Sequence, residues 1–323
     1  MKQGSCLLGL AAGIVSLAGS SGLASDRPSP FLPGKLGFSL QYQEESSAYL
    51  VNSSFVLPGD SITLEAVSRR GSDRFVIDSA AGVLREHSAR QWQWRSPTKT
   101  GLYPLQIRNT SSGELMTLNV FVMVPAKEIE SGRLHGYTIG TYPARSRTQP
   151  PIYDPPRGFI EVTPENENAF LSPHFRLKQF LCKQSGGYPK YLVLRERLLL
   201  KLERILEIVN AKGYRCDSLH VMSGFRTPSY NQAIGNVRYS RHVWGGAADI
   251  FIDQRPRDGV MDDLNGDGRI DRRDAQVLYD IVDAEERLAL HGFSGGLGRY
   301  RSTAAHGPFV HVDVRGFGAR WGN

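Results

Sequence analysis

The alternation of apolar and polar residues divides the chain into a strand-rich first part and a later part with helical periodicity. Between residues 38 and 124, runs such as 61–66 place apolar side chains at every second position, and 116–124 is strongly apolar. Alternation of this kind is typical of strands with one buried face, and the turn residues at 109–113 indicate a hairpin loop. Strands that recur about every ten residues predict an all-β sandwich over residues 26–124.

A proline-rich stretch follows the predicted sandwich. Its six prolines are Pro125, Pro143, Pro150, Pro151, Pro155 and Pro156. Proline at this density predicts an extended, semi-rigid linker over residues 125–157. The apolar period then changes from two to that of a helix within residues 191–210, and Lys212-Gly213 marks the expected helix end. We therefore expect a second, α+β domain with a small antiparallel sheet over residues 158–323.

The first residues have the pattern of an export signal. Lys2 supplies a positive charge, residues 6–17 are apolar or small, and small residues surround Ala24. The apolar run is shorter than the ~20 residues that a membrane span needs. We expect a signal peptide over residues 1–24, export to the periplasm or cell envelope, and no membrane span in the mature chain.

Export changes what the cysteines imply. Removal of the signal leaves Cys182 and Cys216, and disulfides persist outside the cytoplasm. The sequence leaves two alternatives open, a disulfide between them or two separate buried thiols.

Composition and charge exclude several classes of protein. The chain has 323 residues, of which 40% are hydrophobic and 22% charged, and its net charge is +7. These values are typical of a globular protein, and the length favours two domains. No dense Lys/Arg run with aromatic residues is present, so we expect no nucleic-acid partner. A mildly basic balance suits an acidic polymer such as a cell wall.

Two histidines and an aspartate have the composition of a metal site. His242 and Asp249 are seven residues apart, and His311 lies in the alternating run 309–313, where it shares a strand face with Asp313. Two imidazoles and a carboxylate suit zinc with water as a fourth ligand, and zinc lowers the pKa of that water to ~7. The alternative is that these residues only make polar contacts in the core.

Three segments in this region resemble the zinc D-Ala-D-Ala peptidases, which include VanX-type dipeptidases, D,D-carboxypeptidases and murein D,D-endopeptidases. The segments are Ser223-Gly-Phe-Arg226-Thr, Ser240-x-His242-x-x-Gly-x-Ala-x-Asp249 and Phe309-Val-His311-Val-Asp313. The resemblance covers about residues 170–323. The glycine-rich segment 295–300 and Trp321 make the murein endopeptidase branch the nearest.

The resemblance implies a role for each matching residue. His242, Asp249 and His311 match the zinc ligands, Arg226 matches an arginine that steadies substrate or oxyanion, and Ser240 matches a serine near the substrate. The general base departs from the family pattern, because Pro308 and Phe309 occupy the positions of the usual acid or histidine. Asp313 is the preferred base, with orientation of a ligand as its alternative role, and His306 is the other candidate base.

A second motif, within residues 263–274, has the order of ligands found in an EF-hand loop. Its expected calcium ligands are Asp263, Asn265, Asp267, the carbonyl of Arg269, Asp271 and Asp274. Calcium binds six to eight oxygens, and Gly268 takes the sharp-turn position of the loop. Aspartate at the twelfth position resembles the dockerin variant. The sequence predicts one structural calcium ion, with an acidic turn before a helix as the alternative.

The Trp94, Gly101 and Tyr103 spacing resembles immunoglobulin-like modules of exported bacterial proteins. Together these observations predict an exported zinc metallopeptidase that cleaves peptidoglycan stem peptides or cross-links, with D-Ala-containing bonds as the expected site of cleavage. One alternative is a non-catalytic wall-binding or regulatory protein that keeps the peptidase fold. Another is a calcium-dependent adhesion module built on the sandwich.

Overall fold

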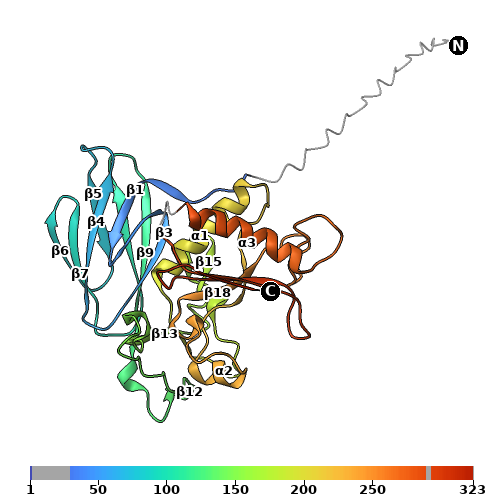
Figure 1. Ribbon diagram of the computed structural model, residues 1–323. Helices are drawn as coiled ribbons and strands as arrows, with labels where there is room; N and C mark the ends of the chain where they lie inside the picture. The colour runs from blue at the N-terminus through green and yellow to red at the C-terminus, as the bar shows by residue number, and fades with distance from the viewer. Residues whose placement is uncertain (2–29, 289–291, 323) are drawn as a thin grey trace. The chain divides into compact units, whose positions relative to one another are not determined.

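The computed structural model describes Met1, residues 30–288 and residues 292–322. Within the part that is described, Phe31–Asn323 forms a compact unit, shown in Figure 1. The predicted signal peptide, residues 1–24, lies outside the described residues apart from Met1. No helix among the described residues is long and apolar enough to cross a membrane.

The first part of the compact unit is a sandwich of two sheets. One sheet has the strand order β2-β1-β4-β7-β6 and the other β3-β9-β8-β5. The strands are β1 (Lys35–Tyr42), β2 (Glu45–Tyr49), β3 (Val51–Val56), β4 (Ser61–Ser68), β5 (Phe75–Ser79), β6 (Val83–Ser88), β7 (Gln91–Arg95), β8 (Gly101–Asn109) and β9 (Leu115–Val122).

Alternation along these strands builds the core of the sandwich. Leu64 and Trp94 of one sheet and Leu105 and Leu118 of the other are fully buried in one apolar cluster. The neighbouring positions of β4 are exposed, which is the period-two pattern read from the sequence. The predicted all-β character of this part is confirmed.

The proline-rich stretch differs from the linker that the sequence predicts. It contains β10 (Val124–Pro125), η1 (Ala126–Glu128), β11 (Arg133–Leu134), β12 (Tyr137–Thr138) and η2 (Pro151–Tyr153). Leu134, Tyr137 and Ile139 are buried in the core of the later part of the chain. The prolines limit regular structure, but these three apolar side chains hold the segment against that core.

The later part is centred on a mixed sheet with the strand order β17-β18-β20-β19-β21. Its strands are β17 (His220–Ser223), β18 (Ala247–Phe251), β19 (Gly296–Tyr300), β20 (Phe309–Asp313) and β21 (Ala319–Trp321). The sequence predicts an antiparallel sheet, and the described pairs agree except that β21 runs parallel to β19, which makes the sheet mixed. Shorter pairs are β13 (Gly158–Val162) with β16 (Lys190–Leu192), and β14 (Phe170–Ser172) with β15 (Phe175–Arg176), the latter followed by η3 (Leu177–Phe180).

Helices cover this sheet. The predicted helix within 191–210 is α1 (Glu196–Ala211), which begins later because β16 occupies residues 190–192. Helix α3 (Arg272–Arg287) contacts α1, β19 and β20 (Figure 1). The short helix α2 (Pro228–Ala233) and the 3-10 turn η4 (Arg241–Trp244) precede β18. The mixture of helices and a small sheet agrees with the α+β class expected for this part.

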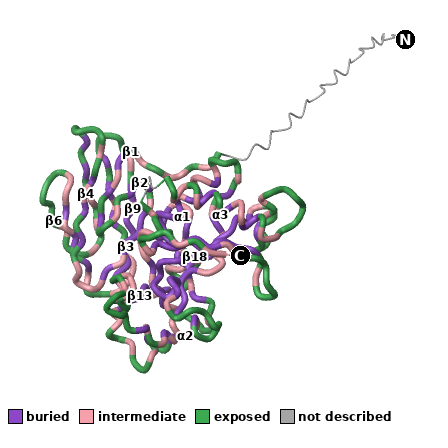
Figure 2. Tube along the Cα trace, viewed as in Figure 1, coloured by how far each residue is buried: buried purple, intermediate pink, exposed green. Residues whose placement is uncertain are grey.

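Strand β3 of the sandwich lies directly against the later part. Ser53 Oγ donates to the Leu171 carbonyl at 2.8 Å, and the Phe55 amide donates to Glu196 Oε1 at 3.1 Å. Asn119 Nδ2, on the neighbouring strand β9, donates to the Phe170 carbonyl at 2.7 Å. Figure 2 shows buried residues throughout this region. The sandwich is therefore packed on α1 and β14.

Candidate metal centre

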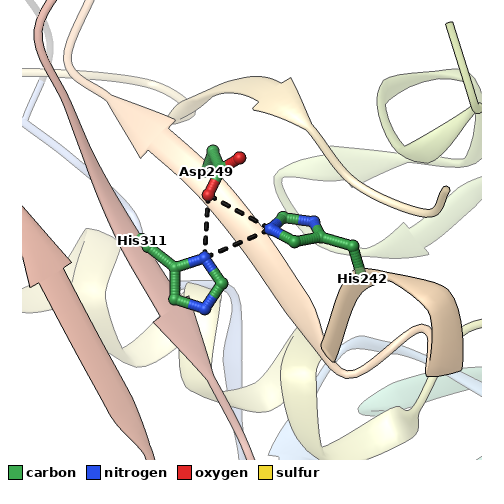
Figure 3. Close-up of side chains that lie close together, drawn as sticks. All are labelled: His242, Asp249 and His311. Carbon is green, nitrogen blue, oxygen red and sulfur yellow. Dashed lines mark hydrogen bonds and ion pairs between the residues drawn. The ribbon is translucent and has the colours of Figure 1, made fainter. Parts of the chain in front are cut away.

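Strand pairing brings two of the three predicted zinc ligands together. Asp249 on β18 is directly opposite His311 on β20 in the antiparallel ladder. His242 reaches them from η4, as Figure 3 shows. Between η4 and β18 the chain turns at Gly245, where φ is 64° and a Cβ atom would lie 2.2 Å from the Val193 carbonyl oxygen. Only glycine fits this turn.

The three side chains converge on one point. Asp249 Oδ1 lies 3.2 Å from His242 Nε2 and 2.8 Å from His311 Nδ1, and the two nitrogens are 3.1 Å apart. All three residues are buried. Among the described residues, no other group of three or more His, Cys, Asp or Glu side chains brings its ligand atoms within 4.8 Å.

The outer hydrogen bonds leave the inward atoms free to bind a cation. His242 Nδ1 donates to the Gly224 carbonyl at 2.7 Å, and His311 Nε2 donates to Asp313 Oδ2 at 3.3 Å. In neutral histidines the other nitrogens then hold lone pairs that face the Asp249 carboxylate. Three acceptors this close repel one another unless a proton or a cation lies between them. The residues fit zinc, whose histidine ligands have outer partners of this kind.

Burial and charge set the protonation of this group. Burial disfavours the charged form of Asp249, but His242 and His311 outweigh it and hold the pKa of Asp249 well below its usual range. Burial lowers the pKa of His242. Burial also acts to lower the pKa of His311, but Asp249 and Asp313 outweigh it and raise that pKa.

Arg226 and Ser240, the predicted substrate-binding residues, both line the cleft at this centre. Arg226 Nη2 donates to Asp249 Oδ2 at 2.5 Å, and its Nε donates to Ser223 Oγ at 2.8 Å. Ser240 is buried directly before η4, and its side chain does not cap that turn. Arg226 is therefore tied to a candidate metal ligand, and its remaining nitrogen, Nη1, is left for a bound molecule.

The two candidate bases occupy different environments. Asp313 is fully buried, accepts hydrogen bonds from the Gly296 amide at 2.7 Å and from Arg315, and contacts the outer nitrogen of His311. Burial disfavours its charged form, but His311 and Arg315 outweigh it and hold its pKa well below the usual range. His306 is partly exposed and lines the cleft. The geometry favours orientation of His311 as the role of Asp313.

The predicted calcium loop lies apart from this centre, and its side chains bond to its own backbone. Asp263 accepts the amides of Gly266 and Gly268, and Asn265 accepts that of Asp267. Asp274 is fully buried and accepts three amides. Asp271 caps α3 by accepting the Arg273 amide, and the backbone amide of Arg269 donates to Asp267 Oδ1. The carboxylates of this loop do not form a convergent group.

The disulfide that the sequence left open is not formed. Cys182 and Cys216 are both free, buried thiols. Cys182 Sγ lies 3.9 Å from Gln184 Oε1, whereas Cys216 Sγ lies 3.9 Å from Asn210 Nδ2. Each thiol therefore packs as a small core side chain with its own polar neighbour, which is the second of the two alternatives.

The centre opens into a cleft of about 970 Å³ whose walls include residues that the sequence analysis did not single out. Tyr153 of η2, Tyr239 and Arg241 line it beside His242. The available signals were an arginine next to a ligand histidine and aromatic residues in the proline-rich stretch. Neither signal distinguishes a cleft wall from ordinary surface without the fold.

Comparisons with known proteins bear on the later part of the chain. No curated protein matches it. A crystal structure of a DUF4784 family protein from Bacteroides caccae has a TM-score of 0.16 and 13% identity, with 28% of this chain and 24% of that chain covered. A likeness this slight carries no argument. Residues 173–265, which include His242 and Asp249, match the family model described as Peptidase M15. This match places the segment 173–265 in the Peptidase M15 family and agrees with the resemblance to the zinc D-Ala-D-Ala peptidases.

Proposed function

We propose that this protein is an exported zinc metallopeptidase that hydrolyses peptidoglycan stem peptides or cross-links at D-Ala-containing bonds. The convergence of His242, Asp249 and His311 within one buried group carries the proposal. The family match supports a metallopeptidase that acts on peptidoglycan-type substrates. From the sequence alone, we also propose that the protein belongs to the murein endopeptidase branch and that it acts in the cell envelope.

The chain's own residues supply the binding and proton transfer that such a reaction needs. Zinc held by His242, Asp249 and His311 would polarise the scissile carbonyl and activate water. Arg226, fixed by its ion pair with Asp249, can direct Nη1 at the developing oxyanion. The base must reach the cleft, so we assign proton transfer to His306, whose ring lines the cleft. Asp313 holds His311 in the orientation in which Nδ1 faces Asp249.

The decisive experiment is digestion of purified peptidoglycan by the mature protein with zinc, followed by mass analysis of the products. Release of D-Ala indicates a carboxypeptidase, whereas conversion of cross-linked dimers to monomers indicates an endopeptidase. A protein that binds zinc and peptidoglycan but releases no product from any muropeptide contradicts the proposal. That result would support the alternative of a wall-binding or regulatory protein.

We also propose a structural role for calcium in the loop 263–274. The order of oxygen-bearing side chains along the loop supports this role. So does the compact turn that is held by hydrogen bonds from backbone amides to the Asp263 carboxylate. Binding requires Asp267 to exchange its ion pair with Arg273, at 2.7 Å, for the cation. The loop leads directly into α3, so calcium would stabilise the start of that helix.

A further inference from the structure

Arg241 is a buried cation whose hydrogen-bonding capacity is not used by the protein. It directly precedes His242 in η4 and is only 3% exposed. Its Nη2 donates to the Ile152 carbonyl at 3.3 Å, whereas Nε and Nη1 have no hydrogen-bond partner among the described residues. Arg195 also donates to the Ile152 carbonyl, at 3.0 Å. That carbonyl therefore does not depend on Arg241.

Aromatic rings fix the plane of this guanidinium group. Its central carbon lies 4.4 Å from the centroid of the Tyr153 ring and 5.7 Å from that of Trp244. Tyr153 packs edge-on against Trp244 at 5.3 Å, and Tyr239 stacks on Trp244 at 6.1 Å. Cation–π contacts orient a guanidinium group but do not satisfy its N–H donors. Nε and Nη1 are thus held in place with no acceptor.

The other arginines that line the cleft already have partners. Arg226 is paired with Asp249, and Arg315 is paired with Asp313. Asp249 is the only carboxylate among the described residues that line the cleft. A bound anion would therefore meet unpaired donors at Arg241 and no competing acid of the protein. A buried donor that lacks an acceptor is unfavourable, so a ligand that supplies the acceptor gains affinity.

A carboxylate is the anion that this geometry fits best. Nε and Nη1 each lie beside Nη2 in the guanidinium group, and Nη2 has a second N–H besides the one directed at the Ile152 carbonyl. That N–H completes a fork with Nε or with Nη1, and such a fork binds the two oxygens of a carboxylate side by side. Peptide substrates carry carboxylates at the C-terminus and on acidic side chains, so the same chemistry has two sources. Arg241 directly precedes the candidate zinc ligand His242 in the sequence, so a carboxylate bound by Arg241 would lie close to the metal centre.

We propose that Arg241 is the carboxylate-binding residue of the cleft and selects peptides with a free carboxylate next to the bond held at the metal centre. Tyr153 and Ile152 of the proline-rich segment 125–157 position its guanidinium group, so that segment forms one wall of the site. The proposal rests on the proposed peptidase function, because it assumes that the ligand is a peptide.

Titration calorimetry on the full mature chain tests the proposal. The probes are N-acetyl-D-Ala-D-Ala, its C-terminal amide, and the same amide extended by one glutamate residue, whose side chain supplies a carboxylate. We expect the free acid to bind more tightly than the amide. Arg241→Met should weaken binding of the acid by about 10- to 100-fold and leave binding of the amide unchanged. If the glutamate probe regains the lost affinity, the carboxylate comes from a side chain; otherwise it is the C-terminus.

Matched variants separate this role from a structural one. Arg238→Gln removes an exposed arginine three residues before Arg241 and should change no affinity, since Arg238 lies outside the cleft lining. Arg241→Lys keeps the charge without the fork and should recover only part of the binding. If Arg241→Met does not fold, as judged by near-UV circular dichroism, Arg241→Lys alone decides the question. Equal affinity of acid and amide for the wild-type protein overturns the proposal.

Failure of this proposal can be told apart from failure of the peptidase proposal. A wild-type protein that hydrolyses the acid and its amide at equal rates, with Arg241→Met indistinguishable from it, keeps the peptidase and rejects the carboxylate site. A protein that prefers the acid in calorimetry, loses that preference in Arg241→Met and hydrolyses nothing keeps the site and rejects the enzyme.

Discussion

The metal centre and the loop 263–274 both present aspartate side chains as candidate metal ligands, yet they use these carboxylates in opposite ways. At the centre, the Asp249 carboxylate faces two histidine nitrogens and Arg226. Within the described residues it accepts no hydrogen bond from a backbone amide. In the loop, Asp263 and Asp274 accept backbone amides of their own segment. The sequence pattern predicts a metal at both places.

This difference shows what a list of ligand residues leaves out. A carboxylate with amide donors is stabilised as an anion without any cation, because each N–H bond favours its charged form. A carboxylate that faces imidazole lone pairs needs a cation or a proton to be stable. The centre therefore needs a bound cation or a proton, whereas the loop has a folded arrangement that depends on neither.

Removal of one histidine should have the largest effect on zinc content and activity, and it tests the claim that the metal centre holds a cation. His311→Ala leaves two ligands, so the bound zinc measured by metal analysis should fall from about one per chain to near zero. Activity should fall by about 10³-fold or more, since the metal supplies several kcal/mol to the transition state. A variant that keeps both its zinc and its activity would contradict the assignment of His311.

The two candidate bases should separate in a matched pair of variants. His306→Gln should retain zinc and lower turnover by roughly 10²- to 10⁴-fold, because a general base is lost. Asp313→Asn should weaken zinc binding and activity together by about 10- to 100-fold, the range for an outer-shell partner of a ligand histidine. If instead Asp313→Asn keeps its zinc but loses turnover, while His306→Gln keeps full turnover, Asp313 is the base.

Asp274 tests the second half of the comparison through stability. Asp274→Ala removes the acceptor of three backbone amides, so the free energy of unfolding should fall by about 3 kcal/mol in urea titrations without added calcium. Zinc content should not change. Asp280→Ala, at an exposed position of the same helix, is the control and should cost less than about 0.5 kcal/mol. Equal losses in both variants would show that the loop is not held by these bonds.

Calcium gives a direct test of whether the loop is more than a self-bonded turn. Calcium at 100 times its dissociation constant should raise the free energy of unfolding by about 2.7 kcal/mol, visible as a higher Tm. Asp267→Ala should abolish this rise. A wild-type Tm that does not respond to calcium would leave the loop as an acidic turn, and a rise that persists in Asp267→Ala would place calcium elsewhere.

Glu196 is a third case, because no cation stabilises its buried carboxylate and few backbone amides donate to it. Burial raises its pKa to about 7 from 4.5, and the Phe55 amide offsets this only in part. The unfolded chain therefore releases this proton first as pH rises, and the free energy of unfolding should decrease between pH 4.5 and 7 and then level off. Partial exposure reduces the expected change to about 2 kcal/mol.

Glu196→Gln provides the matched variant for this pH dependence. The amide keeps an oxygen for the Phe55 N–H but cannot ionise, so the variant should equal the wild type at pH 4 and be more stable at pH 8. Urea titrations at the two pH values measure the difference. A variant less stable than the wild type at pH 8 would show that the carboxylate is favourable where it lies.

The sequence predicted most of what depends on local patterns. Alternation identified the sandwich strands, and the spacing of His242 and Asp249 with the strand around His311 identified the centre, because β18 and β20 carry their ligands at fixed positions of the ladder. It did not predict that Tyr153 meets Arg241, since those residues are far apart in sequence and lie in irregular segments. It also treated 125–157 as a linker, because prolines mask three apolar residues that are spaced by turns.

The pairing of β18 with β20 has a consequence for the order of events during folding. Asp249 and His311 are 62 residues apart in the sequence, and the loop, helix α3 and β19 lie between them, so their pairing is a contact of high sequence separation. Such contacts are entropically expensive and close slowly. Metal capture by all three side chains must therefore wait for the docking of β20. Zinc uptake by a refolding chain would report this late step in real time, as a kinetic probe built into the protein.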